Sequence, residues 1–185
     1  MKSTAALAAA LLLCTSAIAD ELDLSFNEDA FRIVYARDFD TNDLSWDAGF
    51  LNHSDNGWII NGSLYLSGFA SDGVNPLEAG LGIRTGWVDG DNSGQNGVPF
   101  APGGYLKYTL PNYNRISIRA DVYYAPDVLT VDDLEAYKDY SIRVSYNLLR
   151  EADIYVGARY VKGEFDNDTS QRFDTGMNLG VNLRF

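Results

Sequence analysis

The chain has 185 residues, and 26 Asp and Glu against 14 Lys and Arg give it a formal net charge of −12. This excess of acid argues against nucleic acid as a partner, because binding to phosphates needs Lys and Arg. After Ala19 no apolar run approaches the roughly 20 residues of a transmembrane helix, which excludes a helical membrane protein.

The first 19 residues have the pattern of a secretory signal peptide. Lys2 precedes an apolar run, and the small-x-small motif at 17–19 predicts cleavage before Asp20. The run is too short for a membrane anchor, which is the alternative. Cys14 follows Leu13 rather than a small residue, so a lipoprotein signal is discounted. We therefore expect a signal peptide at residues 1–19 and one domain, without cysteine, at residues 20–185.

Alternation of apolar and polar residues recurs along the rest of the chain, which is the period of a strand with two unlike faces. The alternating segments are 21–26, 31–39, 44–51, 57–68, 77–88, 104–110, 115–125, 139–149, 153–163 and 177–185. A membrane admits strands only in a closed barrel, whose strands need about 9–11 residues each. The pattern predicts an all-β, antiparallel, up-and-down transmembrane β-barrel of about ten strands. Eight is the alternative, if the first short pair is a bent arm or one hairpin does not form.

The connections support this interpretation in the second half of the chain. Outer-membrane barrels have long extracellular loops and short periplasmic turns. Residues 89–103, 127–136 and 164–172 are predicted as long loops, and residues 111–114 and 149–152 as short turns. The first half fits less well, because residues 70–76 are long for a periplasmic turn and residues 53–56 are short for an outer loop.

Aromatic residues fall near the ends of the predicted strands, on the apolar face. We place Trp58, Trp87, Tyr124 and Tyr140 at the extracellular ends, and Trp46, Tyr146 and Phe185 at the opposite ends. Two such girdles mark the interfaces of a membrane. A soluble lipocalin-like barrel or a β-sandwich is the alternative, but it would bury the apolar face and would need no girdles.

The opposite face of the strands carries both acidic and basic residues and is expected to line the lumen. The lumen-lining candidates are Arg84, Lys107, Arg119, Asp121, Arg143 and Arg159. Two interpretations stay open, because a small barrel has little interior beyond what side chains fill. The charges form either a salt-bridged plug or the wall of a narrow, water-filled pore, and unpaired Arg would favour anions.

The closing strand ends on an aromatic residue after strict alternation. Its apolar positions are Met177, Leu179, Val181, Leu183 and Phe185. We interpret them as the assembly signal that the outer-membrane β-barrel insertion machinery reads, with periplasmic chaperones and outer-membrane lipid and lipopolysaccharide as further partners.

Two motifs carry weak catalytic or metal-binding patterns. His53 and Ser54 are adjacent, which on a strand sends a base and its nucleophile to opposite faces. Residues 89–94 copy the first ligand positions of a calcium loop, but Phe100 stands where a bidentate Glu is needed. We expect a polar turn and a flexible acidic loop, and therefore no catalytic residue, cofactor or metal.

Four stretches of the chain carry a family resemblance: "LDLSFNEDAFRIVYARDF", "LEAGLGIRTGWV", "VYYAPDVLTVDDLEAYKDYSIRVSYNLL" and "ADIYVGARYVKGEF". They resemble the YfaZ family of proteobacterial outer-membrane proteins, most specifically in "YYAPDVL" and "IYVGARY". The resemblance implies a small outer-membrane barrel, and no functional residue carries over from it. We expect an integral outer-membrane barrel with at most a narrow pore for small solutes or ions. The alternatives are a closed structural or interaction barrel whose acidic loops contact lipopolysaccharide, and, more distantly, a lipid-modifying hydrolase.

Overall fold

The computed structural model describes residues 20–39, 43–69, 77–91, 94–166 and 169–185. The predicted signal peptide, the connection at residues 70–76 and Ser93 of the calcium-like motif lie outside these residues. Within them, no helix is both long and apolar enough to cross a membrane.

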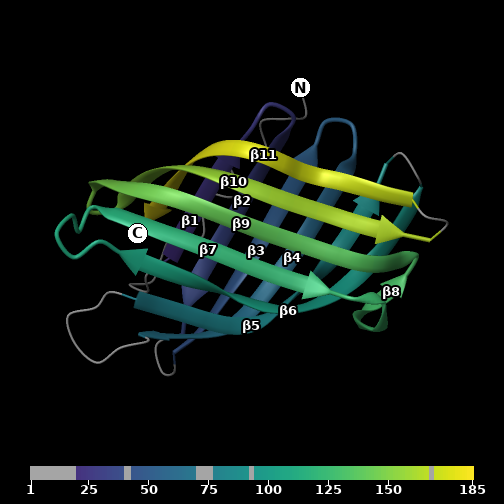
Figure 1. Cartoon of the computed structure of the whole chain (residues 1–185), viewed down its shortest axis with the longest axis horizontal. Helices are drawn as coiled ribbons and strands as arrows, with labels where there is room; N and C mark the ends of the chain where they lie inside the picture. Colours follow the sequence, from purple (N-terminus) through teal and green to yellow (C-terminus); the bar gives the residue numbers. More distant parts are fainter. Residues whose placement is uncertain (1–19, 40–42, 70–76, 92–93, 167–168) are drawn as a thin grey trace.

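Ten antiparallel strands close into a barrel (Figure 1). They are β1 (Asp20–Phe26), β2 (Ala30–Asp38), β3 (Leu44–His53), β4 (Gly57–Phe69), β5 (Leu77–Gly90), β6 (Gln95–Thr109), β7 (Ile116–Ala125), β9 (Leu134–Leu149), β10 (Ala152–Phe165) and β11 (Thr169–Arg184). A 3-10 helix, η2 (Asp127–Leu129), and a three-residue strand, β8 (Thr130–Asp132), sit between β7 and β9, where β8 pairs with β6. The prediction of ten barrel strands is confirmed, and the eight-strand alternative is wrong.

Pairing of β1 with β11 closes the barrel. Asp20 and Phe185 exchange two backbone hydrogen bonds of 3.0 Å, so both ends of the described chain lie together at one end of the barrel. We call this the terminal end and the opposite one, where β8 lies on the right of Figure 1, the distal end.

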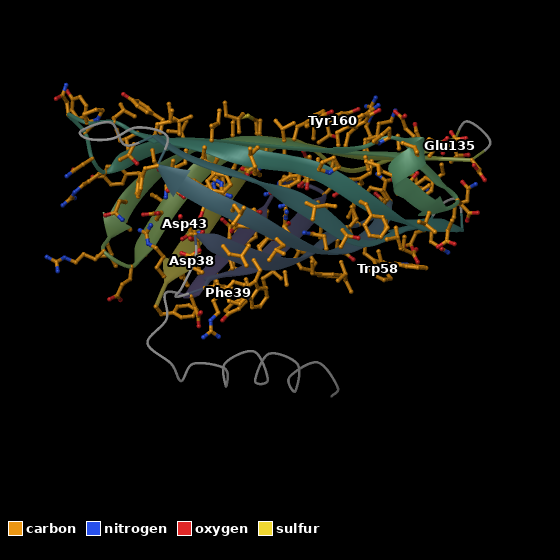
Figure 2. All side chains as sticks on the ribbon, turned by 90° about the horizontal axis from the view of Figure 1, so that it is seen from below. Asp38, Phe39, Asp43, Trp58, Glu135 and Tyr160 are labelled. Atoms are coloured by element: carbon orange, nitrogen blue, oxygen red, sulfur yellow. The ribbon has the colours of Figure 1, made fainter. Side chains whose placement is uncertain are left out.

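The apolar face of each strand points outward, as the alternation predicts. Leu81 is 75 % exposed and Met177 is 68 % exposed, whereas Ser25 and Ser45, on the opposite face, are buried. Exposed apolar side chains cover strands all around the barrel, which is the arrangement that a lipid environment requires. Figure 2 shows Trp58 and Tyr160 on this outer surface, with Glu135 nearer the distal end and Asp38 and Asp43 nearer the terminal end.

The distal loops are shorter than predicted, because the barrel strands continue into the predicted loop segments. Residues 95–103 belong to β6, residues 134–136 to β9, and residues 164–165 and 169–172 to β10 and β11. The Gly and Pro residues at 95–103 had indicated a loop, but in the structure they lie within β6. Pro99 lies where the β5–β6 ladder is interrupted, and it pairs with Thr130 of β8 instead. A Cβ on Gly97 would lie 2.5 Å from that of Leu134, so only glycine fits this close approach.

The earlier start of β9 also moves one member of the predicted girdle. Tyr140 is the seventh residue of β9 rather than an end residue, and it pairs with Tyr160, whose ring stacks on it at 6.3 Å. Tyr124 pairs with Lys138, which precedes Tyr140 by two residues on β9, so Tyr124 lies nearer the distal end than Tyr140 does. We call the outward aromatic residues near this end, which lie at slightly different heights, the distal belt: Trp58, Trp87, Tyr124, Tyr140 and Tyr160.

Because the apolar face points outward, the stability cost of a charged substitution on this face should depend on its depth in the membrane. Leu81→Arg, on the outward face of β5, should lower the free energy of unfolding in phospholipid vesicles by about 2–4 kcal/mol, because it places a cation in the hydrocarbon. Asn52→Arg, near the distal belt of β3, is the control and should cost no more than about 1 kcal/mol. Denaturant titration of both variants measures the difference, and equal costs would show that Leu81 does not face lipid.

Candidate functional site

The interior of the barrel has two chemically different halves. The distal half holds a dry apolar cluster, to which every barrel strand except β1 contributes. Eleven of its twelve members are at most 2 % exposed. We call it the distal plug: Ala30, Leu51, Ile59, Val88, Ala101, Tyr123, Ala125, Leu134, Tyr137, Val161, Phe165 and Phe173.

Sequence reasoning missed the distal plug, because it assigned a polar character to the whole inner face. A signal for it was present in pairs of adjacent apolar residues. At Phe50-Leu51, Ile59-Ile60 and Trp87-Val88, one residue faces lipid and the other enters the plug. These pairs mark the level at which the inner face stops being polar.

The other half of the interior holds a polar cavity of about 300 Å³. Its wall reaches from Arg184 and Asp38 at the terminal end to Arg84 and Arg159 beneath the plug. All six lumen-lining candidates contribute to this wall: Arg84, Lys107, Arg119, Asp121, Arg143 and Arg159. Acidic and basic side chains on the wall are nearly balanced in number.

Arg84 is the centre of the deepest ion-pair network. Its Nη1 donates to Asp139 Oδ2 at 2.6 Å and its Nε to Ser63 Oγ at 2.8 Å, and Asp47 lies 3.7 Å from Nη2. The guanidinium also stacks over the ring of Tyr123, at 3.9 Å. Tyr123 belongs to the distal plug, so Arg84 joins the polar half of the interior to the apolar half.

Asp139 is shared by more than one cation. Besides Arg84, it lies 3.9 Å from Nη2 of Arg32 and accepts a hydrogen bond of 3.4 Å from the hydroxyl of Tyr137. Asp139 is 2 % exposed and Arg32 is 9 % exposed. Buried charges are tolerated only when they are paired, so this carboxylate holds two buried guanidinium groups in place.

The charges nearer the terminal end are paired as well. Arg119 binds Asp121 through both Nε and Nη2, at 3.0–3.3 Å, and stacks over Tyr105 at 3.9 Å. Glu78 accepts hydrogen bonds from Tyr105 at 2.6 Å and from Lys107 at 3.3 Å. The four charged side chains of these pairs are only partly buried, whereas Tyr105 is buried.

The two remaining arginines bind carboxylates from β1 and β11. Arg143 donates to Asp23 at 2.5 Å, and Tyr155 donates to the other oxygen of Asp23 at 2.7 Å. Arg159 donates to Asp174 at 2.6 Å. Each arginine among the lumen-lining candidates thus has a carboxylate partner, which is the arrangement expected of a salt-bridged interior.

The described part of the two weak motifs does not assemble a site. The two ring nitrogens of His53 contact the backbone N–H of Asp55 and the amide of Asn56, and Ser54 donates to Asp55. Asp89 of the calcium-like motif lies within β5, paired with Asn96. Among the described residues no group of three or more His, Cys, Asp or Glu could hold a metal ion.

The five residues of the predicted assembly signal lie on the outer face of β11 and at its end. Met177, Leu179 and Phe185 are more than half exposed, and Val181 and Leu183 are partly exposed. Their neighbour across the closing ladder is β1, where Leu22 pairs with Leu183 and Leu24 with Val181.

A closed antiparallel barrel with an apolar outer belt and a charged interior is the architecture of an outer-membrane type of transmembrane β-barrel. Among such proteins the chain belongs to the YfaZ family, because the family model described as YfaZ precursor matches residues 1–185, the whole chain.

The chain is also similar to solved structures of outer-membrane proteins. One is the outer membrane channel DcaP of Acinetobacter baumannii, with 13 % identity and a TM-score of 0.48, over 88 % of this chain and 54 % of that one. Another is the NanC porin, with 12 % identity and a TM-score of 0.49, over 91 % of this chain and 100 % of that one. The chain therefore spans about half the length of DcaP. No curated protein sequence matches it.

The shared carboxylate predicts a large stability effect. Asp139→Asn should lower the free energy of unfolding in vesicles by about 3–5 kcal/mol, because Arg32 would remain buried without a counter-charge and Arg84 would keep only Asp47, 3.7 Å away. Glu164→Gln removes the acid of a partly exposed ion pair on the outer surface and should cost less than about 1 kcal/mol. Losses of equal size for the two variants would contradict the central role of Asp139.

Proposed function

We propose that this protein is an integral β-barrel of the outer membrane that is closed to passive diffusion and acts through its surfaces, as a structural or interaction barrel. The distal plug carries this proposal, because buried apolar side chains from nine strands pack together inside the distal half. The proposal includes export by a signal peptide at residues 1–19 and a barrel domain at residues 20–185. The terminal end then faces the periplasm and the distal end the outside of the cell.

A narrow pore for small solutes or ions is the second candidate, and the polar cavity of about 300 Å³ favours it. Apolar constrictions gate channels by excluding water. In this candidate, movement of plug side chains such as Phe165 and Phe173 would open a path from the cavity. The charges of Arg119 and Arg143 on the cavity wall would then set the ion selectivity.

Conductance across planar bilayers separates the two candidates. Wild-type protein should give no stable unitary conductance, and the Phe165→Ala/Phe173→Ala variant should conduct, because it removes two fully buried rings from the plug. Leu179→Ala/Met177→Ala removes a similar amount of apolar side chain from the lipid face and should stay silent. Circular dichroism and protease protection establish that each inserted protein is folded.

The outcomes are distinct. Wild-type conductance, with a selectivity that moves toward cations in Arg143→Glu, would replace the closed barrel by the pore. Silence of the folded plug variant would show that these rings are not what closes the lumen.

We also propose that the aromatic ring of Phe185 is read during assembly by the outer-membrane insertion machinery. Deletion of Phe185 should lower the inserted fraction in cells, but it also removes the two backbone bonds to Asp20. Phe185→Ala keeps these bonds and should still lower the inserted fraction, while leaving stability after refolding in vitro nearly unchanged. Tyr146→Ala, an outward aromatic residue at the same end of the barrel, is the control. Normal insertion of Phe185→Ala would refute the proposal.

A further inference from the structure

Three cations lie side by side on the outer surface of the distal half. The register aligns Lys138 of β9 with Lys162 of β10, and Lys162 with Arg172 of β11. We call these three residues the cationic row. Of the Lys and Arg residues in the described part of the chain, no others face outward in this half of the barrel. The row is therefore a local concentration of positive charge on a protein with a net charge of −12.

The cationic row lies directly beyond the membrane-facing surface. Tyr140 and Tyr160, two residues nearer the terminal end on β9 and β10, form the stacked pair of the distal belt. Below them the outward positions are apolar: Ile142 and Val144 on β9, Val156 and Ile154 on β10. Aromatic belts sit at the level of lipid headgroups, and two residues of a strand span about 7 Å. The row is thus at the height of the headgroup phosphates.

Internal contacts hold the lysines of the row without neutralising it. Glu164 accepts hydrogen bonds from Lys138 at 2.7 Å and from Lys162 at 2.9 Å, so one carboxylate fixes two ammonium groups. Arg172 is exposed, and its guanidinium has no ion pair within the described residues. Three positive charges thus face one negative charge. Further toward the distal end the side chains become acidic, at Asp132 and Glu135, which confines the positive charge to this level.

We propose that the cationic row binds the phosphate groups of lipopolysaccharide in the outer leaflet, with the acyl chains of the lipid lying along the apolar outer face of β9–β11. Lys and Arg are the residues that hold phosphate, and long cationic side chains at a membrane interface extend from the apolar surface toward headgroups. The inference rests on the proposed outer-membrane placement with the distal end outside. It does not depend on whether the lumen conducts.

Native mass spectrometry of the refolded barrel with defined lipids tests the site. Wild-type protein should retain lipopolysaccharide in preference to the same lipid after removal of its phosphates. Lys162→Gln/Arg172→Gln should weaken this binding by about tenfold or more, because each cation near an anionic membrane surface contributes on the order of 1 kcal/mol. The variant leaves the Lys138–Glu164 pair intact. Inorganic phosphate at the same concentration should not compete, because it has no acyl chains to lie on the apolar face.

The control is Arg115→Gln/Arg150→Gln, which removes the same charge from exposed turns at the terminal end and should keep the preference. Equal weakening by the control, or no preference of folded wild-type protein for the phosphorylated lipid, would overturn the proposal. Circular dichroism and protease protection identify failure of the barrel to fold, and the conductance measurement tests the proposed function separately.

Discussion

Within the hydrocarbon of a membrane every backbone N–H and C=O must find its partner inside the protein, and the whole architecture follows from this requirement. The ladder between β1 and β11 meets it, because without that ladder the first and last strands would present open edges to lipid. Since the diameter of a barrel grows with its number of strands, closure with ten strands also sets how much interior the remaining side chains have to fill.

The interior is filled by apolar packing in one half and by ion pairs in the other, and both connect strands across the barrel. In the distal half, side chains from nine strands pack as in a soluble core. In the terminal half, ion pairs join strands that are not neighbours. Arg84–Asp139 links β5 to β9, and Arg143–Asp23 links β9 to β1, three strands away in each case. Such pairs resist flattening of the barrel, which the hydrogen bonds between adjacent strands do not.

The strands and their outward face could be predicted from the sequence, because alternation is a local property that lipid enforces on every strand. The distal extensions could not, because Pro99 and Gly97 indicate a loop until the neighbouring chain is known. The candidates on the cavity wall followed from the same alternation. Their partners did not, since the partner of Arg84 on β9 is set by how the two intervening strands, β6 and β7, stagger around the barrel. The distal plug could be predicted only if each pair of adjacent apolar residues was interpreted as one residue on the lipid face and one on the inner face.

The two chemically different halves of the interior make the barrel asymmetric along its axis. The distal plug lies inside the distal half, whereas the wall of the polar cavity includes Arg184 and Asp38 at the terminal end. The outer surface is asymmetric along the same axis, because the cationic row lies only near the distal belt. The barrel therefore differs along its axis both inside, where the polar cavity lies toward the terminal end, and outside, where the cationic row lies toward the distal end.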